Sequence, residues 1–467
     1  MSKSSNTGLN AGRRSFLQRS ALLSLAGVGA PFALNLAAMA EAAAQSTGSS
    51  DYKALVCVFL TGGNDHANTL VPYDELSHAD YAHARGGIAL ARDSLTPTAL
   101  SSLDVTGRQM ALAPALAPLL PLFDDGRMAG LLNIGPLVVP TSLAQYQARS
   151  VPLPAKLFSH NDQQSAWQSW GPEGTTEGWG GRSADVLMSG NGQASLTCIN
   201  ASGSAVFLSG QTAVPYMVSP AGVPDVYAMN GGLFGSQGCV DAFQKLVTQT
   251  QQSHLFAAEH ARVMSRALDV NARLRGALNS QPALATAFDG SNPLAAQLAM
   301  VAHLLSARNT LSMRRQVFFV QLGGFDLHDN LSSRHPVLLG QLASALVSFQ
   351  QALDEMGLGK QVTTFTASDF GRTLSSNGDG SDHGWGSHHF VLGRAVQGNR
   401  LYGEWPEAGL TGQHDVGQGR LLPTLSVQQL AVSLARWFGV PSSELDLVAP
   451  GYTGFDAGTL SGLMSNV

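Results

Sequence analysis

The chain has 467 residues, and its 27 basic residues against 32 acidic ones give a formal net charge of −5 at neutral pH. Binding to nucleic acid depends on clustered Lys and Arg, and no such stretch occurs, so the composition argues against a nucleic-acid partner. Its three cysteines, Cys57, Cys198 and Cys239, allow at most one disulfide and exclude a disulfide-dense scaffold.

The first forty residues have the order of an export signal peptide. A polar start leads into an apolar run from Ala21, and small residues follow it. Residues 13–17 (RRSFL) resemble the core of a twin-arginine signal. Two glycines and a proline interrupt the apolar run, which falls short of the ~20 residues that a membrane span needs. We therefore expect residues 1–40 to direct export by the Tat translocase, with cleavage after Ala40 or as late as Ala44. The mature protein would be periplasmic or secreted, without a membrane span.

Short apolar runs and helical patterns alternate along the rest of the chain. Three β-rich runs are nearly uninterrupted, at residues 54–60, 316–322 and 362–366. Such runs are typical of strands buried on both faces. Residues 292–313 and 427–438 have apolar side chains at helical spacing. This alternation predicts a mainly parallel sheet with helices on both faces, in a single domain that spans residues 51–467 with loop insertions.

An aspartate follows each of the three predicted strands. These residues are Asp65, Asp326 and Asp369. Ligands bind outside the carboxyl ends of parallel strands, so the three carboxylates are expected to converge at one edge of the sheet. A single Asp after a strand is often a turn former or a helix cap. The recurrence, rather than any one residue, therefore indicates a functional site.

Histidines accompany these acids. His328 lies two residues after Asp326, and His383 and His388 lie in the segment 382–389. Imidazole and carboxylate ligands together suit Zn, Mn or Fe, whereas a purely carboxylate site favours Mg or Ca. His388 and its neighbour His389 point opposite ways if the segment is extended, so at most one of them can face the site. The pattern predicts a divalent metal site.

The segment around His160 offers further polar groups. Ser159 and Asp162 match a capping box that opens a helix, and a helix N-terminus can also hold a phosphate or sulfate group beside the Ser159 hydroxyl. His160 and Asp162, with a distant histidine, have the composition of a mononuclear iron site. Arg372 could grip an anionic substrate bidentately, or it could pair with Asp369.

Six short motifs occur in order along the chain, at Gly62–Asp65, Asn68–Pro72, Ser159-His160, Gly323–His328, Ser368–Thr373 and Asp382–Gly386. Together they resemble a large bacterial family of proteins that are exported by the twin-arginine pathway and whose function is unknown. The resemblance runs from about Tyr52 to the C-terminus. That family is in turn similar to the alkaline phosphatase and sulfatase superfamily, whose metal ligands and nucleophile lie at the carboxyl ends of the strands.

The resemblance implies a three-layer α/β/α sandwich with a mainly parallel central sheet. It also implies an order of metal ligands, in which each position is filled by a residue of this chain. These are Asp65, then Asp326 with His328, then Asp369, and finally His383 or His388. Ser159 is the best-placed hydroxyl for a nucleophile and Thr69 is the next, and we group His160 and Arg372 with Ser159 as candidate catalytic residues.

Two departures from the superfamily pattern bear on the chemistry. Phe370 follows Asp369 where alkaline phosphatase-like enzymes have a histidine, and the spacing from Asp326 to His328 is narrower than theirs. The chain also lacks the Cys/Ser-x-Pro-x-Arg context in which sulfatases make formylglycine, which disfavours an ordinary sulfatase.

These observations lead to one main expectation and two alternatives. The main expectation is an exported hydrolase of a small phosphate or sulfate ester that uses Zn, Mn, Mg or Ca. The first alternative is a non-catalytic envelope or binding protein on a degenerate phosphatase-like fold, which Phe370 and the missing second histidine make credible. The second is a mononuclear iron enzyme built on His160 and Asp162.

Overall fold

The computed structural model describes residues 52–465, apart from residues 105, 204, 225–232 and 250–253. The described residues belong to one unit that begins at Asp51. The expected signal peptide, residues 1–40, lies outside the described residues, so export by the Tat translocase stays a prediction.

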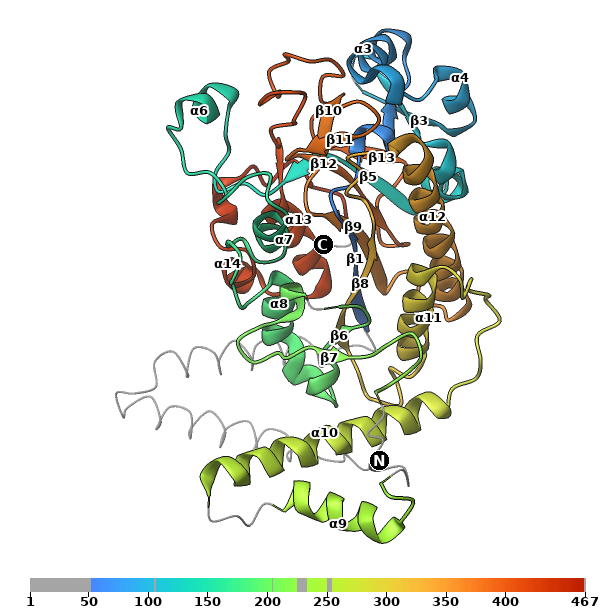
Figure 1. Cartoon of the computed structure of the whole chain (residues 1–467), viewed down its shortest axis with the longest axis vertical. Helices are drawn as coiled ribbons and strands as arrows, with labels where there is room; N and C mark the ends of the chain where they lie inside the picture. Colours follow the sequence, from blue (N-terminus) through green and yellow to red (C-terminus); the bar gives the residue numbers. More distant parts are fainter. Residues whose placement is uncertain (1–51, 105, 204, 225–232, 250–253, 466–467) are drawn as a thin grey trace, which may run out of the picture. The chain divides into compact units, whose positions relative to one another are not determined.

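A mainly parallel sheet forms the centre of this unit (Figure 1). Within the described part of the chain, nine strands build the sheet in the order β13-β5-β12-β9-β1-β8-β6-β7, with β14 beside β5. Only β12 among them runs antiparallel to its neighbours. The mixed α/β class and the mainly parallel sheet are therefore confirmed. The strands are β1 (Lys53–Thr61), β5 (Met128–Gly135), β6 (Cys198–Asn200), β7 (Tyr216–Met217), β8 (Arg315–Gly323), β9 (Val362–Ser368), β12 (Ser387–Leu392), β13 (Arg400–Tyr402) and β14 (Leu425–Ser426).

The three strands predicted from sequence are neighbours at the middle of this sheet. β1 lies between β8 and β9 and is parallel to both. Leu60 of β1 is level with Leu322 of β8 and with Ser368 of β9. The carboxyl ends of the strands therefore meet at one edge, and the loops that follow them begin side by side.

Both faces of β1 are covered by apolar side chains. Val56 and Val58 point into the large core that also contains α11 and α12. Phe59 lies on the opposite face, where its ring stacks against Phe319 with 5.9 Å between the centroids, and Phe319 in turn contacts Phe207. A strand that is buried on both faces is apolar throughout, which is why the sequence shows an uninterrupted run.

Helices flank the sheet on both sides in Figure 1. Two of them, α11 and α12, pack against each other on one side, and the others lie across the sheet from them. The predicted helix at residues 427–438 is confirmed: a capping box of Ser426 and Gln429 opens it, and Gly439 closes it at φ 113°. The helix predicted at residues 292–313 is shorter, because the chain turns after Ser306. These helices are α7 (His160–Ser169), α8 (Trp179–Leu187), α11 (Pro293–Ser306), α12 (Leu331–Glu355), α13 (Val427–Phe438) and α14 (Leu445–Val448).

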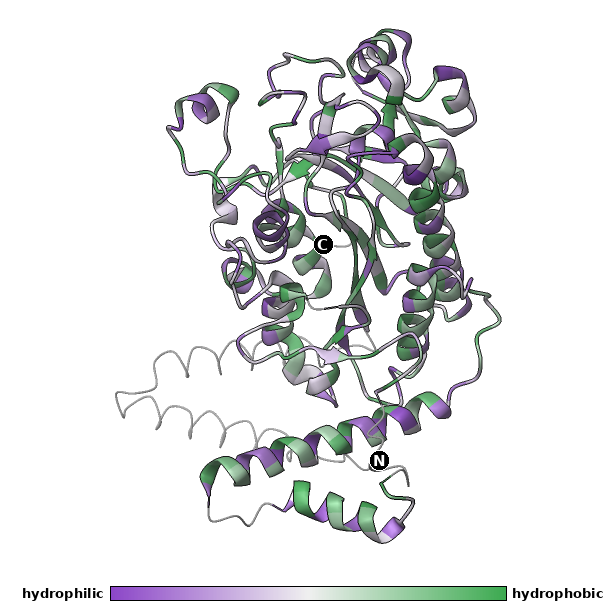
Figure 2. Cartoon of the chain, in the orientation of Figure 1, coloured by the Kyte–Doolittle hydropathy of each residue, from purple (hydrophilic) through white to green (hydrophobic). Residues whose placement is uncertain are grey.

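The remaining elements lie outside the central sheet. Figure 2 shows hydrophobic residues gathered along the central strands, whereas α9 and α10 alternate hydrophobic and hydrophilic residues along their length. None of the described helices is both long and apolar enough to cross a bilayer. The remaining elements are α3 (Glu75–Arg85), α4 (Arg92–Leu95), α5 (Leu120–Asp124), α6 (Leu143–Ala148), α9 (Gln237–Thr248), α10 (Leu255–Asn279), β2 (Leu70–Pro72), β3 (Ala99–Leu103), β4 (Gln109–Leu112), β10 (Arg372–Ser376), β11 (Ser381–His383) and several short 3₁₀ helices, among them η2 (His66–Asn68).

The loop after β1 needs a glycine at position 62. Gly62 has φ 115°, and a Cβ there would lie 2.4 Å from the backbone nitrogen of Asp326. We expect Gly62→Ala to lower the free energy of unfolding by about 2–4 kcal/mol, because it adds a clash to a left-handed backbone. Gly126→Ala is the matched control: Gly126 has φ 72° but open space around it, so about 1 kcal/mol is expected. Urea unfolding of both variants measures the difference, and equal losses would contradict the predicted clash.

Candidate metal centre

The loops after β8 and β9 bring Asp326 and Asp369 to the same place at the edge of the sheet. His160, the first residue of α7, lies between them. Its Nδ1 is 2.6 Å from Oδ2 of Asp369, and its Nε2 is 3.4 Å from Oδ2 of Asp326. The side chain of Asp326 is 44% exposed, whereas Asp369 is fully buried. The two carboxylates therefore differ in access to solvent.

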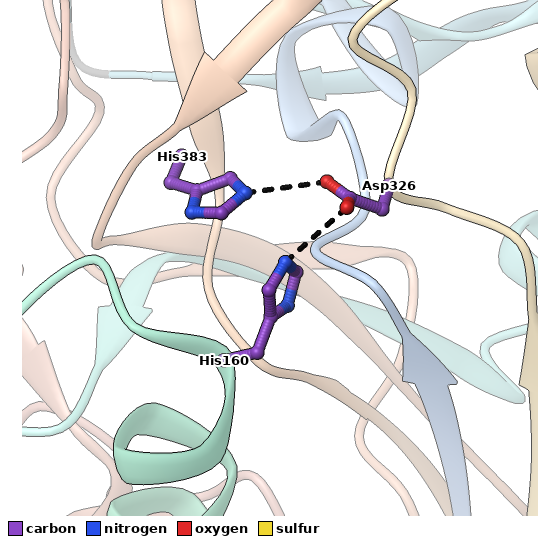
Figure 3. A group of neighbouring side chains, drawn as sticks. All are labelled: His160, Asp326 and His383. Carbon is purple, nitrogen blue, oxygen red and sulfur yellow. Dashed lines mark hydrogen bonds and ion pairs between the residues drawn. The ribbon is translucent and has the colours of Figure 1, made fainter.

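Asp326 is the carboxylate around which the site is arranged. Arg372 donates to its Oδ1 over 2.6 Å, and the Nε2 atoms of His328 and His383 lie 3.0 and 3.3 Å from the same oxygen. Figure 3 shows Asp326 facing His160 and His383 from the opposite side of the site. Burial alone would raise the pKa of Asp326, but the hydrogen bond and charge of Arg372 hold it below its usual range.

Asp369 holds His160 in place. Besides the histidine, it accepts hydrogen bonds from Nε2 of Gln164 over 2.9 Å and from the backbone nitrogen of Gly62 over 3.1 Å. Gln164 lies four residues after His160 in α7, so both side chains leave the same face of the helix. The hydrogen bond to Asp369 is the main cause that raises the pKa of His160. Asp369 thus orients the imidazole instead of pointing to the open side of the site.

A backbone carbonyl holds His383. Nδ1 of His383 donates to the carbonyl oxygen of Phe158 over 2.8 Å, and burial lowers the pKa of the imidazole. Phe158 has φ 73°, a left-handed conformation that costs a bulky residue about 1–2 kcal/mol. Backbone strain of this kind is often found at functional sites. Here the left-handed conformation directs the carbonyl oxygen of Phe158 toward His383. Phe158 lies two residues before His160.

His328 and Asp382 complete the group. Nδ1 of His328 is 3.0 Å from Oδ1 of Asp382, and its Nε2 is 3.0 Å from Nε2 of His383. Burial alone would raise the pKa of Asp382, but hydrogen bonds from Asn377 and His328 hold it below its usual range. Like Asp326, His328 is 44% exposed, so this side of the group is open.

Three of these residues could hold a metal ion. One ligand atom from each of His160, Asp326 and His383 can be chosen so that all three lie within 4.8 Å of one another. Two imidazoles and a carboxylate are common ligands of Zn and Fe in proteins. The donor set therefore fits a divalent ion, and the open side leaves room for water or a substrate.

Phe370 closes the floor of this site. Its ring lies 4.8 Å from the ring of His160 and 4.7 Å from that of His383, centroid to centroid, and it is fully buried. A Cβ on Gly63 would lie 2.4 Å from the Phe370 ring, so the ring fills the space beneath the histidines. Position 370 thus carries a packing side chain and supplies no metal ligand.

Two predicted metal ligands, Asp65 and His388, lie apart from this group. Asp65 forms a buried ion pair of 2.6 Å with Arg85 and accepts from the hydroxyl of Ser381 over 3.0 Å. Burial alone would raise the pKa of Asp65, but the Arg85 guanidinium holds it well below its usual range. His388 is buried in β12, where its Nδ1 accepts from the backbone nitrogen of Asn133 over 3.1 Å. Their polar atoms are occupied by structural contacts.

Ser159 and Asp162 contact each other rather than forming a full capping box. Ser159 is the N-cap of α7, but its hydroxyl donates to Oδ2 of Asp162 over 3.0 Å and makes no bond to the helix backbone. Asp162 also accepts from the backbone nitrogen of Glu173, over 3.4 Å. The carboxylate that joins His160 in the group of three is therefore Asp326, not Asp162 as the iron-site alternative supposes.

Arg372 is an internal residue. Its side chain is fully buried and donates to Asp326, to the carbonyl oxygen of Gly62 over 3.1 Å, and to the carbonyl oxygen of Ser381. The sequence suggested two roles for Arg372, namely direct binding of an anionic substrate and an ion pair with Asp369. These contacts match neither role. Arg372 instead fixes the orientation of Asp326.

Several orienting groups were not predicted. They are Gln164, Asp382 and the carbonyl of Phe158. Gln164 follows His160 by one helical turn and Asp382 directly precedes His383, so the sequence carried a weak signal for both. It carried none for Phe158, because any residue supplies a carbonyl.

Comparison with known proteins assigns the family. A family model described as a protein of unknown function, DUF1501, matches residues 52–442. The chain belongs to the DUF1501 family. No curated protein matches it.

Solved structures give two distant likenesses to this DUF1501 chain. One is the crystal structure of Ps i-CgsB in complex with k-i-k-neocarrahexaose, which is 10% identical over 87% of this chain and 78% of that one. The other solved structure carries the description "Metabolism of multiple glycosaminoglycans by bacteroides thetaiotaomicron is orchestrated by a versatile core genetic locus (BT33494S-sulf)". It is 11% identical over 90% of this chain and 78% of that one. Both TM-scores are 0.34, too low for a shared fold to be concluded from them.

The buried pair of Asp65 and Arg85 generates a stability prediction. Arg85 is fully buried and also donates to the carbonyl oxygen of Thr373. Arg85→Met leaves Asp65 as an uncompensated buried charge, so we expect a loss of about 3–5 kcal/mol in the free energy of unfolding. The double variant Asp65→Asn with Arg85→Met removes that charge and should regain part of the loss. Chemical denaturation measures both, and a double variant as unstable as the single one would show that the charge is not the cause.

Buried neutral histidines generate a pH prediction. Burial lowers the pKa of His66 and of His335 to about 4, whereas an unfolded histidine has a pKa near 6.5. Between these values the unfolded chain binds protons that the folded chain does not, so stability is full above about pH 6.5 and falls as the pH drops toward 4. Each such histidine contributes a slope of about 1.4 kcal/mol per pH unit.

His335 permits a direct test of this slope. Its Nε2 donates to Oδ1 of Asn64 over 2.9 Å, a bond that the amide of His335→Gln can replace without titrating. The free energy of unfolding of this variant, measured from pH 7 to pH 5, should fall less steeply than that of the unmodified protein. His260→Gln, on the exposed surface of α10, should leave the slope unchanged. Identical slopes for all three proteins would contradict the prediction.

Proposed function

We propose that this protein is an exported, metal-dependent hydrolase of a small phosphate or sulfate ester. The observation that carries the proposal is the convergence of imidazole nitrogens from His160, His328 and His383 on the half-exposed carboxylate of Asp326. Histidine and carboxylate ligands beside an open face are the usual composition of a hydrolytic metal site.

The roles of the residues follow from their contacts. Asp326, His160 and His383 would hold the ion, Arg372 keeps the carboxylate in one orientation, and Asp369 keeps His160 in one tautomer. A bound divalent ion would supply Lewis acidity, which polarises the ester oxygen and makes water more acidic. The open face beside Asp326 and His328 would admit the substrate.

A further cation, Arg420, supports an anionic substrate. Nε of Arg420 donates to the carbonyl oxygen of His383 over 2.7 Å, and its guanidinium lies 5.1 Å from the centre of the Phe158 ring. Phe158 and His383 both belong to the candidate site, so the positive charge lies at its margin. Positive charge at a site raises the local concentration of anions.

The attacking hydroxyl has two possible sources. Ser159 precedes His160 and already donates its proton to the buried carboxylate of Asp162, the arrangement that a nucleophile and its base require. The other source is water. Substitution of Ser159 by Ala separates them, since only the serine route would lose its nucleophile.

The fold and the location belong to the same proposal. Helices on both faces of a mainly parallel sheet support a three-layer, alkaline phosphatase-like sandwich in a single domain from residue 51 to 467. The twin-arginine motif at residues 13–17 supports export to the periplasm or beyond. Fold resemblance by itself does not determine the reaction.

A non-catalytic envelope or binding protein is the second candidate. The specific observations that favour it are the burial of Arg372 and the position of Phe370, which fills the floor beneath the histidines. Such a protein could keep the metal as a structural element. Activity measurements distinguish the two candidates.

The test is hydrolysis of phosphomonoesters, phosphodiesters and sulfate esters by the mature chain after loading with Zn, Mn, Fe, Mg or Ca. Asp326→Asn keeps the shape of the side chain and removes its charge, so we expect activity to fall at least about 100-fold. Asp269→Asn, an exposed residue of α10, should retain full activity. Circular dichroism checks that both variants are folded. If no metal gives activity toward any of these esters, the hydrolase is rejected and the non-catalytic candidate stands.

A further inference from the structure

The three histidines of the site have their Nδ1 atoms occupied. Nδ1 of His160 faces Asp369, that of His328 faces Asp382, and that of His383 faces the carbonyl oxygen of Phe158. All three partners are acceptors, so each Nδ1 carries the proton. In a neutral imidazole the other nitrogen is then an unprotonated acceptor. The structure thus presets three histidines in the same tautomer, with Nε2 available as a ligand.

The Nε2 atoms of these histidines lie near the carboxylate of Asp326. None of them carries a proton that could form a hydrogen bond to it. The two Nε2 atoms of His328 and His383 are 3.0 Å apart, and both lie 3.0–3.3 Å from Oδ1 of Asp326. His160 approaches the other oxygen of that carboxylate at 3.4 Å. Atoms that share a tetrahedral ion at about 2.0–2.1 Å lie about 3.3–3.4 Å apart. The separations among His328, His383 and Asp326, and that of His160 from Asp326, are close to this value. Acceptors that face each other without a cation repel.

From this geometry we infer that the site binds one first-row transition-metal ion per chain, of the Zn²⁺ and Fe²⁺ class, through the Nε2 atoms of His160, His328 and His383 and the carboxylate of Asp326. The inference rests on the same site as the proposed hydrolase and adds a fourth ligand, His328, and the class of metal. Three imidazoles and one carboxylate form a nitrogen-rich set. Mg²⁺ and Ca²⁺ prefer oxygen ligands, so this set selects against them.

The surroundings favour a single ion. Phe370 fills the floor beneath His160 and His383. Asp369 is used by His160 and Gln164, and Arg372 places a buried positive charge directly behind Asp326. Among the described residues, His160, Asp326 and His383 have ligand atoms within 4.8 Å of one another, and His328 lies 3.0 Å from two of these residues, so all four side chains gather at one place. A second ion beside Asp326 would lack ligands on the inner side.

Asp369, Asp382 and the Phe158 carbonyl are positioning groups in this scheme. Each holds one histidine by the nitrogen that does not face the ion. Partners of this kind fix the tautomer and raise the basicity of the ligand, and their loss typically weakens metal binding about 10- to 100-fold. Asp382 is the most suitable of them for a test, because it is partly exposed and its substitution does not leave a buried cavity.

Metal titration of the mature chain, stripped with a chelator, tests the inference. We expect one equivalent of Zn²⁺ to saturate the protein, and Co²⁺ to give the intense visible absorption of a low-coordinate, nitrogen-rich site. An excess of Mg²⁺ or Ca²⁺ should not displace either ion. Two equivalents of tightly bound Zn²⁺, equal competition by Mg²⁺, or no binding at all would each overturn the inference.

Variants test the fourth ligand. His328→Ala removes a half-exposed side chain, so the fold should persist, and we expect the Kd for Zn²⁺ to rise about 100-fold with a changed Co²⁺ spectrum. Asp382→Asn should raise the Kd about 10- to 100-fold. His260→Ala, on the exposed surface of α10, should match the unmodified protein. An unchanged Kd and spectrum for His328→Ala would remove His328 from the ligand set.

The outcomes separate this inference from the proposed function. If Zn²⁺ binds as described but no ester is hydrolysed, the metal site stands and the hydrolase falls. If esters are hydrolysed with Mg²⁺ or Ca²⁺ and His328→Ala is fully active, the hydrolase stands and the inferred ligand set falls.

Discussion

The position of one buried guanidinium determines the arrangement of the whole site. Arg372 bonds to the carbonyl oxygen of Gly62 after β1, to Asp326 after β8, and to Ser381 in β11. These segments are far apart in the sequence, and the central sheet brings them to one edge. Arg372 then ties them together from inside, where water cannot compete. Because its charge is buried, it requires a nearby carboxylate, and the partly exposed Asp326 provides it. The same ion pair therefore stabilises the loops and turns a carboxylate toward the histidines.

The three acids at the edge of the sheet have separate tasks. Asp65 neutralises Arg85 inside the protein, Asp369 orients His160, and Asp326 alone keeps a half-exposed side chain. This division follows from burial: a fully buried carboxylate needs charged or polar partners on all sides, which leaves no oxygen for a ligand. The exposed one can exchange partners.

The sequence predicted the scaffold better than the use of its polar residues. The strands β1, β8 and β9 and the helix α13 follow from apolar patterns. Burial on both faces makes a strand an uninterrupted apolar run, and burial of one face gives a helix apolar residues at helical spacing. The positions of Asp326 and His328 beside one edge follow from the order of strands and loops, and His383 was expected beside them. His160 was considered only as the start of a helix and as a candidate catalytic or iron-binding residue, so its place beside Asp326 was not predicted. The sequence does not show which polar side chains form hydrogen bonds or ion pairs with residues that are distant along the chain. Asp65 and its ion-pair partner Arg85 are twenty residues apart, and Arg372 donates to the carbonyl oxygen of Gly62. No local sequence pattern predicts such pairs. His388 was considered as an alternative to His383 for the last ligand, and its burial in β12, where it accepts a hydrogen bond from Asn133 of β5, could not be predicted from the local sequence.

The ligands of the candidate centre come from three separate stretches of chain, at residues 160, 326–328 and 383, and a fourth stretch, residues 369–372, supplies groups that orient them. No stretch on its own holds more than a fragment of the coordination sphere, so an unfolded chain has little affinity for the metal. Binding and folding are then one thermodynamic event. With the proposed metal bound, a protein of this design would take up the ion where it folds. If export proceeds by the twin-arginine route, that place is the cytoplasm, and the metal pool of the cytoplasm, rather than that of the envelope, decides which ion the exported protein carries.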